Sequence, residues 1–206
     1  VPRSGGTGPQ LPGGMTIACL FGTFDPPHRG HVHIARRVLE VPGVDRVWLV
    51  VTPRNPFKVD RPVSPDAHRM AMVRIAVQGV PGVEASDAEL GLPPPNYTVD
   101  TLREFRTRWP EHQFVLVIGS DNLAQLHRWK DPEDILAHHR VLVFPRPGVE
   151  GHEGLSRHPG ITLLAGPVMD VSSTGIRAAI REGRDPGPEL DPSVAAHIGR
   201  HGLYRD

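Results

Sequence analysis

The sequence predicts an α/β protein: a doubly wound parallel sheet with helices on both faces and a small helical part at the C-terminus. Short apolar segments alternate along the chain with longer segments whose apolar residues recur at helical spacing. The short segments, such as 47–51 and 114–118, are apolar throughout rather than at every second residue, which is typical of strands covered on both faces. Right-handed crossovers between parallel strands then bring ligands to the carboxyl ends of the strands.

Six strands are expected where short apolar runs are bounded by glycine, proline or polar residues. In chain order they cover residues 17–21, 46–52, 83–86, 114–118, 140–144 and 161–164. The first helix is expected over residues 32–39, and the second begins with Ser64 as its N-cap and Pro65 as its first residue. The apolar face of this second helix is predicted to contain Met70, Val73, Ala76 and Val77.

Later helices begin at the same kinds of signal, a polar N-cap residue or a proline as the first helical residue. These signals stand at Thr98, at residues 119–121, at Asp131-Pro132, at Ser172 or Ser173, and at Asp191-Pro192. The third helix is expected to end before Pro110, and the last one near Gly199. The turn-rich segment 145–159 is expected to be a surface loop.

Composition and charge exclude several classes of protein. The 23 basic and 23 acidic residues give a formal net charge of zero, which argues against a protein that coats nucleic acid or an anionic membrane. The longest apolar runs fall far short of the roughly 20 residues needed to span a bilayer. The single cysteine, Cys19, excludes a disulfide framework and fits a reducing compartment. We therefore expect a cytoplasmic protein that binds neither nucleic acid nor membrane.

The first 14 residues are expected to lie outside the domain. Val1-Pro2-Arg3-Ser4 resembles the remainder of a protease cleavage site, residues 5–14 resemble a glycine-rich linker, and Met15 is the natural start. Residues 15–206 are expected to form one domain, which is long enough for a sizeable core. The sequence leaves open whether this domain forms a homo-oligomer.

The most informative segment is residues 21–31, FGTFDPPHRGH, where the first strand meets the first helix. A helix N-terminus presents free N–H groups and the positive end of the helix dipole, so it favours anions. Gly22 lets a ligand approach the backbone, Gly30 leaves room for a phosphate, and His28 and His31 project from one face of the first turn. Imidazole N–H donors there can hold phosphate oxygens as charge accumulates during phosphoryl transfer.

The same histidines have other interpretations. The chain contains 12 histidines, so an H-x-x-H pair can arise by chance and serve only in packing. A zinc site made of His28, His31 and His33 would lack a cysteine or a carboxylate ligand at regular spacing. No protein-held metal is therefore predicted at this motif.

A second motif, VSSTGIR at residues 171–177, also lies at a predicted helix N-terminus. The hydroxyls of Ser172, Ser173 and Thr174 and the free N–H groups of the helix would form a second anion cradle. Arg177 could reach phosphate oxygens with two donors at once. Taken alone, the motif is also compatible with an ordinary serine N-cap followed by an exposed arginine.

The two segments resemble the T/S-F-D/N-P-x-H-x-G-H and I-S-S-T-x-x-R signatures of the nucleotidyltransferase superfamily, in the expected order. Phe21 departs from the pattern, since many relatives have the first glycine of a pair there. Within the superfamily the chain resembles the bacterial nicotinate-nucleotide adenylyltransferases from Met15 onward, at residues 53–58, 68–70, 96–102, 119–122 and 127–130. The resemblance implies a Rossmann-like fold and adenylyl transfer from ATP to nicotinate mononucleotide in NAD biosynthesis, which yields deamido-NAD and pyrophosphate.

The resemblance also implies roles for individual residues. The expected catalytic residues are His28, His31 and Arg177. ATP is expected to contact Gly22, Thr23, Phe24, Gly30, Gly119, Asp121, Ser172, Ser173 and Thr174. Nicotinate mononucleotide is expected at Tyr97, Thr98, Trp129, Lys130 and Lys58, with Arg54 as a further candidate for its phosphate. Mg²⁺ is expected to arrive with ATP, held by phosphates and water rather than by protein ligands.

Alternatives remain for residues and for function. Asp121 and Thr98 could be plain helix N-caps, and Trp129 could be a core residue. The acceptor could instead be nicotinamide mononucleotide or phosphopantetheine, or the protein could be a noncatalytic nucleotide-binding module. Relatives that use phosphopantetheine usually have threonine at the position of His28 and lack counterparts of Tyr97, Thr98 and Trp129, which favours nicotinate mononucleotide.

Overall fold

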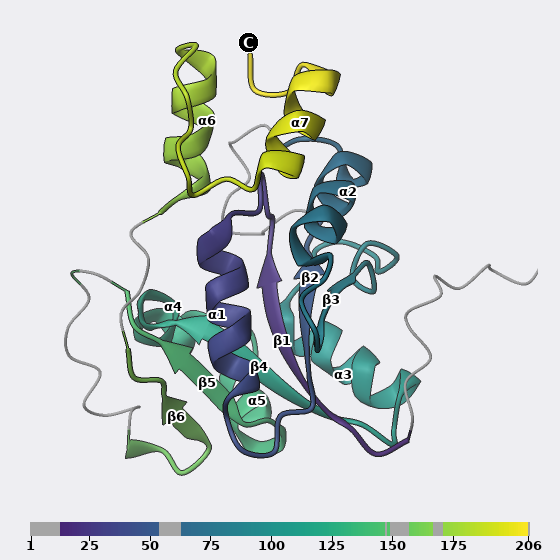
Figure 1. Ribbon diagram of the computed structural model, residues 1–206. Coiled ribbons are helices and arrows are strands. Elements are labelled where there is room, and N and C mark those ends of the chain that lie inside the picture. The colour runs from purple at the N-terminus through teal and green to yellow at the C-terminus, as the bar shows by residue number, and fades with distance from the viewer. Residues whose placement is uncertain (1–12, 54–62, 147, 149–156, 167–170, 206) are drawn as a thin grey trace, which may run out of the picture.

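The protein is built on a six-stranded sheet in which every pair of neighbouring strands is parallel (Figure 1). The computed structural model describes residues 13–53, 63–146, 148, 157–166 and 171–205. The spatial order of the strands is β3-β2-β1-β4-β5-β6. Their bounds are β1 (Thr16–Gly22), β2 (Arg46–Val51), β3 (Val83–Ser86), β4 (Gln113–Gly119), β5 (Val141–Phe144) and β6 (Ile161–Leu163). The order reverses between β1 and β4, as in doubly wound sheets, and the predicted fold class is confirmed.

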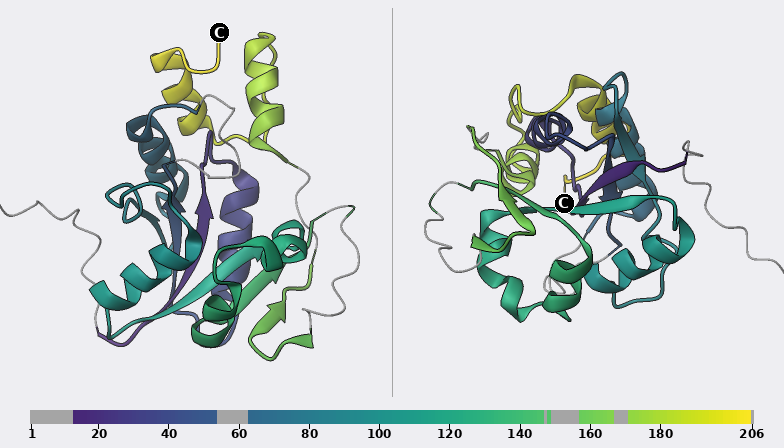
Figure 2. Two further views of the ribbon diagram at one scale, coloured as in Figure 1. Left: turned by 180° about the vertical axis from the view of Figure 1, so that it is seen from behind. Right: turned by 90° about the horizontal axis from the view of Figure 1, so that it is seen from below.

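Helices cover both faces of this sheet. One face carries α1 (Arg29–Leu39) and α2 (Asp66–Val77), and the other carries α3 (Thr98–Arg108), α4 (Ser120–Gln125) and α5 (Pro132–His138). A short 3-10 helix, η1 (Leu126–Arg128), follows α4. The last two helices, α6 (Ser173–Arg181) and α7 (Pro192–His201), stand beyond the carboxyl end of β1, as Figures 1 and 2 show. They form the expected helical C-terminal part.

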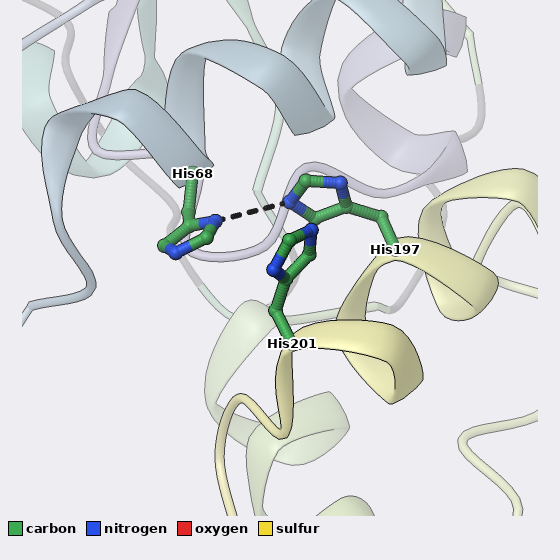
Figure 3. A group of neighbouring side chains, drawn as sticks. All are labelled: His68, His197 and His201. Atoms are coloured by element: carbon green, nitrogen blue, oxygen red, sulfur yellow. Dashed lines mark hydrogen bonds between the residues drawn. The ribbon is translucent and has the colours of Figure 1, made fainter.

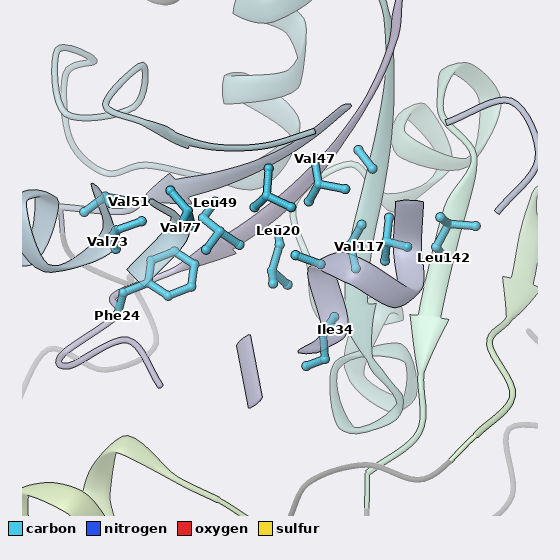
Figure 4. Packing of buried hydrophobic residues seen from close by; sticks show 14 of the residues in the cluster. Leu20, Phe24, Ile34, Val47, Leu49, Val51, Val73, Val77, Val117 and Leu142 are labelled. Carbon is cyan, nitrogen blue, oxygen red and sulfur yellow. The ribbon is translucent and has the colours of Figure 1, made fainter. Parts of the chain in front are cut away.

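The pleat of the strands divides their apolar side chains between two cores. In β1, Ala18 and Leu20 face the core under α1 and α2, whereas Ile17 and Cys19 face the core under α3, α4 and α5. Figure 4 shows the first of these cores, where residues of β1, β2, β4 and β5 pack against α1 and α2. Because both faces are buried, alternate positions of a strand are equally apolar, which is the pattern seen in the sequence.

A third, smaller apolar cluster holds the C-terminal helices against α2. Met72 points away from the sheet and packs with Ile176 of the second motif and with three residues that follow the motif, namely Leu190, Val194 and Ile198. Ala76, predicted on the sheet-facing side of α2, packs against this third cluster instead. The helix α2 is therefore covered on two sides, which a single apolar stripe does not reveal. Within the described residues, no helix is long and apolar enough to cross a membrane.

Two predicted helix boundaries were wrong. Pro65 rather than Ser64 is the N-cap of α2, because the backbone of Ser64 has other partners: its N–H donates to Asp25 Oδ2 (3.2 Å) and its carbonyl accepts from Arg69. The helix α7 does not end near Gly199 but continues to His201. Gly202, with φ of 62°, ends it in the left-handed conformation that glycine adopts without strain.

Arg69, near the start of α2, is fully buried and holds three segments together. Its Nη1 donates to the carbonyls of Thr23 and Thr52, both at 2.7 Å, its Nη2 to the carbonyl of Pro53 at 3.1 Å, and its Nε to the carbonyl of Ser64 at 2.9 Å. The carboxylate three residues earlier on the chain pairs with its charge. Since Thr23 and Thr52 follow β1 and β2, the guanidinium fastens the loops after two central strands to the start of α2.

We predict that Arg69→Leu lowers the free energy of unfolding by about 3–5 kcal/mol, because it leaves several buried carbonyls and a carboxylate without their donor. The matched control is Arg74→Leu on the same helix, whose side chain is 64% exposed and only loosely paired with Asp87 at 3.6 Å. It should change the free energy of unfolding by less than about 1 kcal/mol. Urea denaturation of the three proteins measures both effects, and equal losses would contradict the role given to Arg69.

Candidate functional site

A cavity of about 630 Å³ opens at the carboxyl end of the sheet, where the strand order reverses between β1 and β4. Ligands of doubly wound sheets bind at such a reversal. The cavity lining includes most of the predicted site residues, namely Gly22, Thr23, Phe24, His28, His31, Tyr97, Thr98, Gly119, Asp121, Trp129, Lys130, Ser172, Ser173, Thr174 and Arg177. Lys58 and Arg54 lie outside the described residues.

Gly30 does not line this cavity, and the space beside it is already filled. A Cβ at this position would lie 2.8 Å from Val171 Cγ1 and 3.0 Å from His28 Nδ1. Gly30 therefore lets α1 pack closely against the second motif and against His28, rather than making room for a phosphate. Gly22 has a comparable role, because a Cβ there would lie 3.0 Å from the ring of Phe24.

His28 and His31 form a stacked pair at the start of α1. Their ring centroids are 3.7 Å apart, and the N–H of His28 donates to Nδ1 of His31 at 3.2 Å. Because Nδ1 of His31 accepts this hydrogen bond, the proton of the neutral ring is carried by Nε2. The ring of Phe24 packs edge-on against His31, with centroids 4.9 Å apart. The orientation and the tautomer of His31 are thus both defined by its neighbours.

Both imidazoles are neutral at neutral pH. Burial, with the nearby Arg146 charge, lowers the pKa of His28 to about 4. Burial also lowers the pKa of His31 well below its ordinary value, and His28 and Arg146 add to this effect. The pair can therefore offer N–H donors to an anion without carrying a positive charge of its own.

The two sequence motifs meet directly at the mouth of the cavity. Ser173 Oγ donates to the carbonyl of Pro26 at 2.9 Å across 147 positions of sequence, and Arg177 Nη1 donates to the carbonyl of Asp25 at 2.6 Å. Ser172 rather than Ser173 is the N-cap of α6, since its hydroxyl accepts from the N–H of Gly175 at 3.1 Å. The N-termini of α1 and α6 therefore lie at the same cavity, and the positive end of each helix dipole favours an anion there.

Asp25 connects the first motif by hydrogen bonds to two distant parts of the chain. It is buried, with 4% of its surface exposed, and its two carboxylate oxygens accept from the hydroxyl of Tyr204 and the N–H of Ser64. Burial and the hydrogen bond to Asp25 raise the pKa of Tyr204, so its hydroxyl stays a donor. The loop that carries His28 is consequently tied to the chain segment after α7 as well as to α6.

A carboxylate and a guanidinium face each other across the opposite side of the cavity. Asp121 lies in the first turn of α4, whose N-cap is Gly119, so the interpretation of Asp121 as an N-cap is wrong. Its Oδ1 is buried without a hydrogen-bond partner and lies 3.7 Å from the Nε of Arg146, which also has none. The guanidinium of Arg146 stacks on the ring of Phe144. Both side chains line the cavity, and their opposite charges face each other there.

The third region of the cavity surrounds the start of α3. Thr98 is the first residue of this helix and Tyr97 is its N-cap, so the prediction that Thr98 caps the helix was wrong. Lys130 donates to Asp100 at 2.7 Å and lies over the ring of Tyr97, 5.2 Å from its centroid. Trp129 lines the cavity and also packs against the second core, so the interpretation of Trp129 as a core residue is confirmed and its ring also borders the cavity.

Known proteins resemble this chain along nearly its whole length. It matches the model of the cytidylyltransferase-like family over residues 19–179, a range that contains both motifs, residues 21–31 and 171–177. It is 39% identical to a probable nicotinate-nucleotide adenylyltransferase of Flavobacterium johnsoniae, over 93% of this chain and 100% of that protein. A protein of the same name from Roseiflexus sp. is 36% identical over 92% of this chain and 98% of its own length. The chain belongs to the nicotinate-nucleotide adenylyltransferase family.

The fold agrees with that of solved structures. The nicotinic acid mononucleotide adenylyltransferase of Plasmodium falciparum, complexed with NaAD, is similar to this chain with a TM-score of 0.79 and 19% sequence identity. The match covers 92% of this chain and 97% of that one. The two chains therefore share a fold despite their low sequence identity.

Sequence reasoning missed two charged residues in the cavity of this adenylyltransferase family member. Arg146 follows β5 directly, and the rule that ligands gather after parallel strands could have singled it out. Glu89 is 2% exposed, accepts from Thr101 Oγ1 at 2.6 Å through Oε1, and has no partner at Oε2. Burial raises the pKa of Glu89 to about 7. No local pattern marks Glu89, because its neighbours become close only in the fold.

The low pKa of His28 makes stability depend on pH in a definite direction. The unfolded chain binds a proton at this imidazole near pH 6.5 and the folded protein only near pH 4, so acid favours unfolding in that window. We predict that lowering the pH from 7.5 to 4.5 decreases the free energy of unfolding of both proteins, and that the decrease is about 2–3 kcal/mol larger for the unmodified protein than for His28→Asn. Urea denaturation at several pH values measures the difference.

The exposed His127 supplies the control for this prediction, and His127→Asn should keep the full pH dependence. Glu89 contributes with the opposite sign, because its raised pKa favours the folded protein as the pH falls from 7 toward 4.5. Both the unmodified protein and His28→Asn contain Glu89, so its contribution cancels when the pH dependences of the two proteins are compared. Parallel curves for the unmodified protein and His28→Asn would contradict the neutral state of His28.

Proposed function

We propose that this protein transfers the adenylyl group of ATP to nicotinate mononucleotide, giving deamido-NAD and pyrophosphate. The proposal rests on one observation: the N-termini of α1 and α6 meet at one cavity. Hydrogen bonds from Ser173 to the carbonyl of Pro26 and from Arg177 to the carbonyl of Asp25 hold them together. The names of the relatives point to the same reaction. The buried, unpaired Cys19 fits a reducing compartment such as the cytoplasm, where ATP and mononucleotides are available.

The chemistry requires placement and charge stabilisation rather than a base. A phosphate oxygen of the mononucleotide attacks the α-phosphorus of ATP, the bond to the β-phosphate bridging oxygen breaks, and pyrophosphate leaves with that electron pair. The attacking phosphate is already ionised at neutral pH, so no residue has to remove a proton. In this scheme His28 and His31 donate to the phosphoryl oxygens, while Arg177 and the hydroxyls of 172–174 hold the departing phosphates.

ATP is expected to bring Mg²⁺, which neutralises phosphate charge when bound. Three carboxylates line the described part of the cavity, those of Asp25, Glu89 and Asp121. Both oxygens of Asp25 have partners and Glu89 is largely buried, so a full set of protein ligands is not available. This arrangement suits a cation held mainly by phosphates and water. Gly119 and Asp121 would then contact the nucleoside of ATP, and the carboxylate of Asp121, whose side chain is 47% exposed, would accept from a ribose hydroxyl.

The acceptor is assigned to the region at the start of α3. The face of Trp129 suits a pyridine ring, and the first N–H groups of α3, together with the Thr98 hydroxyl, are donors. Donors suit the carboxylate of nicotinate, which only accepts hydrogen bonds, better than the amide of nicotinamide. The ammonium of Lys130 is already engaged by Asp100, so the selectivity is assigned to the helix end and Thr98 rather than to this lysine.

We predict that His31→Asn lowers kcat by roughly 10²–10³-fold, the scale found when one donor to a transition state is lost. Asparagine can keep the acceptor that His28 N–H uses, but it removes the donor at Nε2. The control is His33→Ala, two residues further along α1. Pyrophosphate release measures kcat and circular dichroism checks the fold. A folded His31→Asn protein with near-normal kcat would overturn the catalytic role.

We also predict that kcat/KM is at least about 10²-fold higher for nicotinate than for nicotinamide mononucleotide, because each unpaired donor costs about 1–3 kcal/mol. Trp129→Ala should harm both acceptors equally, whereas Thr98→Val should narrow the ratio. Pyrophosphate release with ATP and each acceptor, phosphopantetheine included, makes the measurement. Equal values for the two mononucleotides would refute this pocket, and the absence of release with every acceptor would favour a noncatalytic nucleotide-binding protein.

A further inference from the structure

Three histidines gather on the side of the molecule where the C-terminal helix packs on α2, outside the cavity described above (Figure 3). His68 lies in the first turn of α2, and His197 and His201 lie one turn apart on α7. Residues four apart on a helix point to the same side, so the two rings of α7 both face His68. None of the three belongs to the cavity lining.

The spacing of their nitrogens is close to that of a metal site. His68 Nδ1 and His197 Nε2 are 3.3 Å apart, and one nitrogen of each of the three rings can be chosen so that all lie within 4.8 Å of one another. In a tetrahedral zinc site with Zn–N bonds of 2.0–2.1 Å, two ligand nitrogens are about 3.3 Å apart. One pair therefore already has the required separation, and the exposed side chain of His201 needs only a small rotation to join it.

We propose that His68, His197 and His201 bind one divalent transition-metal ion of the kind that imidazole prefers, such as Zn²⁺, and that this ion fastens α7 to α2. Three imidazoles suit zinc, copper or nickel rather than Mg²⁺ or Ca²⁺, which prefer oxygen ligands. Three protein ligands leave a fourth position for water. The two helices are already in contact through Met72, Val194 and Ile198, so the site is supported by a packed interface.

The site lies next to the groups that hold the first motif in place. His68 directly precedes Arg69, whose guanidinium binds the carbonyl of Thr23, and α7 leads into Tyr204, whose hydroxyl binds Asp25. A bound ion would therefore link both supports of the loop that carries His28. Its role is structural, because the histidines lie outside the cavity and contact no residue that is assigned to the reaction.

The test uses the full chain after dialysis against a chelator, in metal-free buffer. Isothermal titration calorimetry with Zn²⁺ alone should give a stoichiometry of about one ion per chain. Addition of Co²⁺ in place of Zn²⁺ should produce the visible absorption of a four-coordinate cobalt site. The expected loss of zinc affinity is about 100-fold or more for His197→Ala and for His201→Ala. A zinc concentration about 100-fold above the dissociation constant should raise Tm by roughly 5 °C or more in the unmodified protein only.

Two control variants separate this site from other histidines. His127→Ala, an exposed histidine elsewhere, and His31→Asn, in the cavity, should bind zinc as tightly as the unmodified protein. Circular dichroism establishes that each variant is folded, and His201 is exposed, so its replacement is the variant least disturbing to packing. The proposal is overturned if zinc does not bind in a one-to-one ratio, if binding survives His201→Ala and His197→Ala unchanged, or if it depends on His31. In those cases the 3.3 Å contact is only a hydrogen bond between two imidazoles.

Discussion

The buried guanidinium of Arg69 is the contact on which the geometry of the site depends. A parallel sheet leaves the loops after its strands at one edge, but it does not define their conformations. In this protein the carbonyls of Thr23 and Thr52, at the ends of β1 and β2, and that of Ser64, before α2, converge on one side chain. A charged group without exposed surface is stable only when its donors are satisfied, so the three segments constrain one another. The loop that presents His28 and His31 is thereby held before any ligand arrives.

The second motif completes the site by attaching to that loop rather than to the sheet. Ser173 and Arg177 bind the carbonyls of Pro26 and Asp25, so the N-terminus of α6 is positioned by the first motif itself. Asp25 in turn receives the hydroxyl of Tyr204 from beyond α7. Two helix N-termini are brought to one cavity, and the positive ends of their dipoles suit a ligand with several phosphates. Preorganised donors of this kind stabilise charge that develops during reaction without reorganising at that moment.

The electrostatics of the cavity combine two neutral imidazole donors with the fixed charges of Arg146 and Asp121. Burial lowers the pKa values of His28 and His31, and Arg146 lowers them further. Arg146 and Asp121 remain close but without a hydrogen bond between them. An arriving polyanion would meet imidazole N–H groups whose orientation is set by the His28–His31 hydrogen bond, rather than two mobile cations. Neutral imidazoles also avoid the mutual repulsion that two protonated rings stacked at 3.7 Å would create.

The sequence by itself determined the sheet, the order of its elements and both phosphate-binding motifs, because each leaves a local trace: apolar runs for strands buried on both faces, and polar caps at helix starts. The resemblance to the two signature motifs singled out Phe24, His28, Ser172 and Arg177, and all four line the cavity. Only the tertiary structure decided which distant groups meet. In the sequence, Arg69 resembles an ordinary helical arginine and Glu89 resembles a loop carboxylate. Nothing in the local sequence relates His68 to His201. These residues meet partners up to 129 positions away along the chain, and local periodicity carries no information about such contacts because backbone spacing repeats over only a few residues.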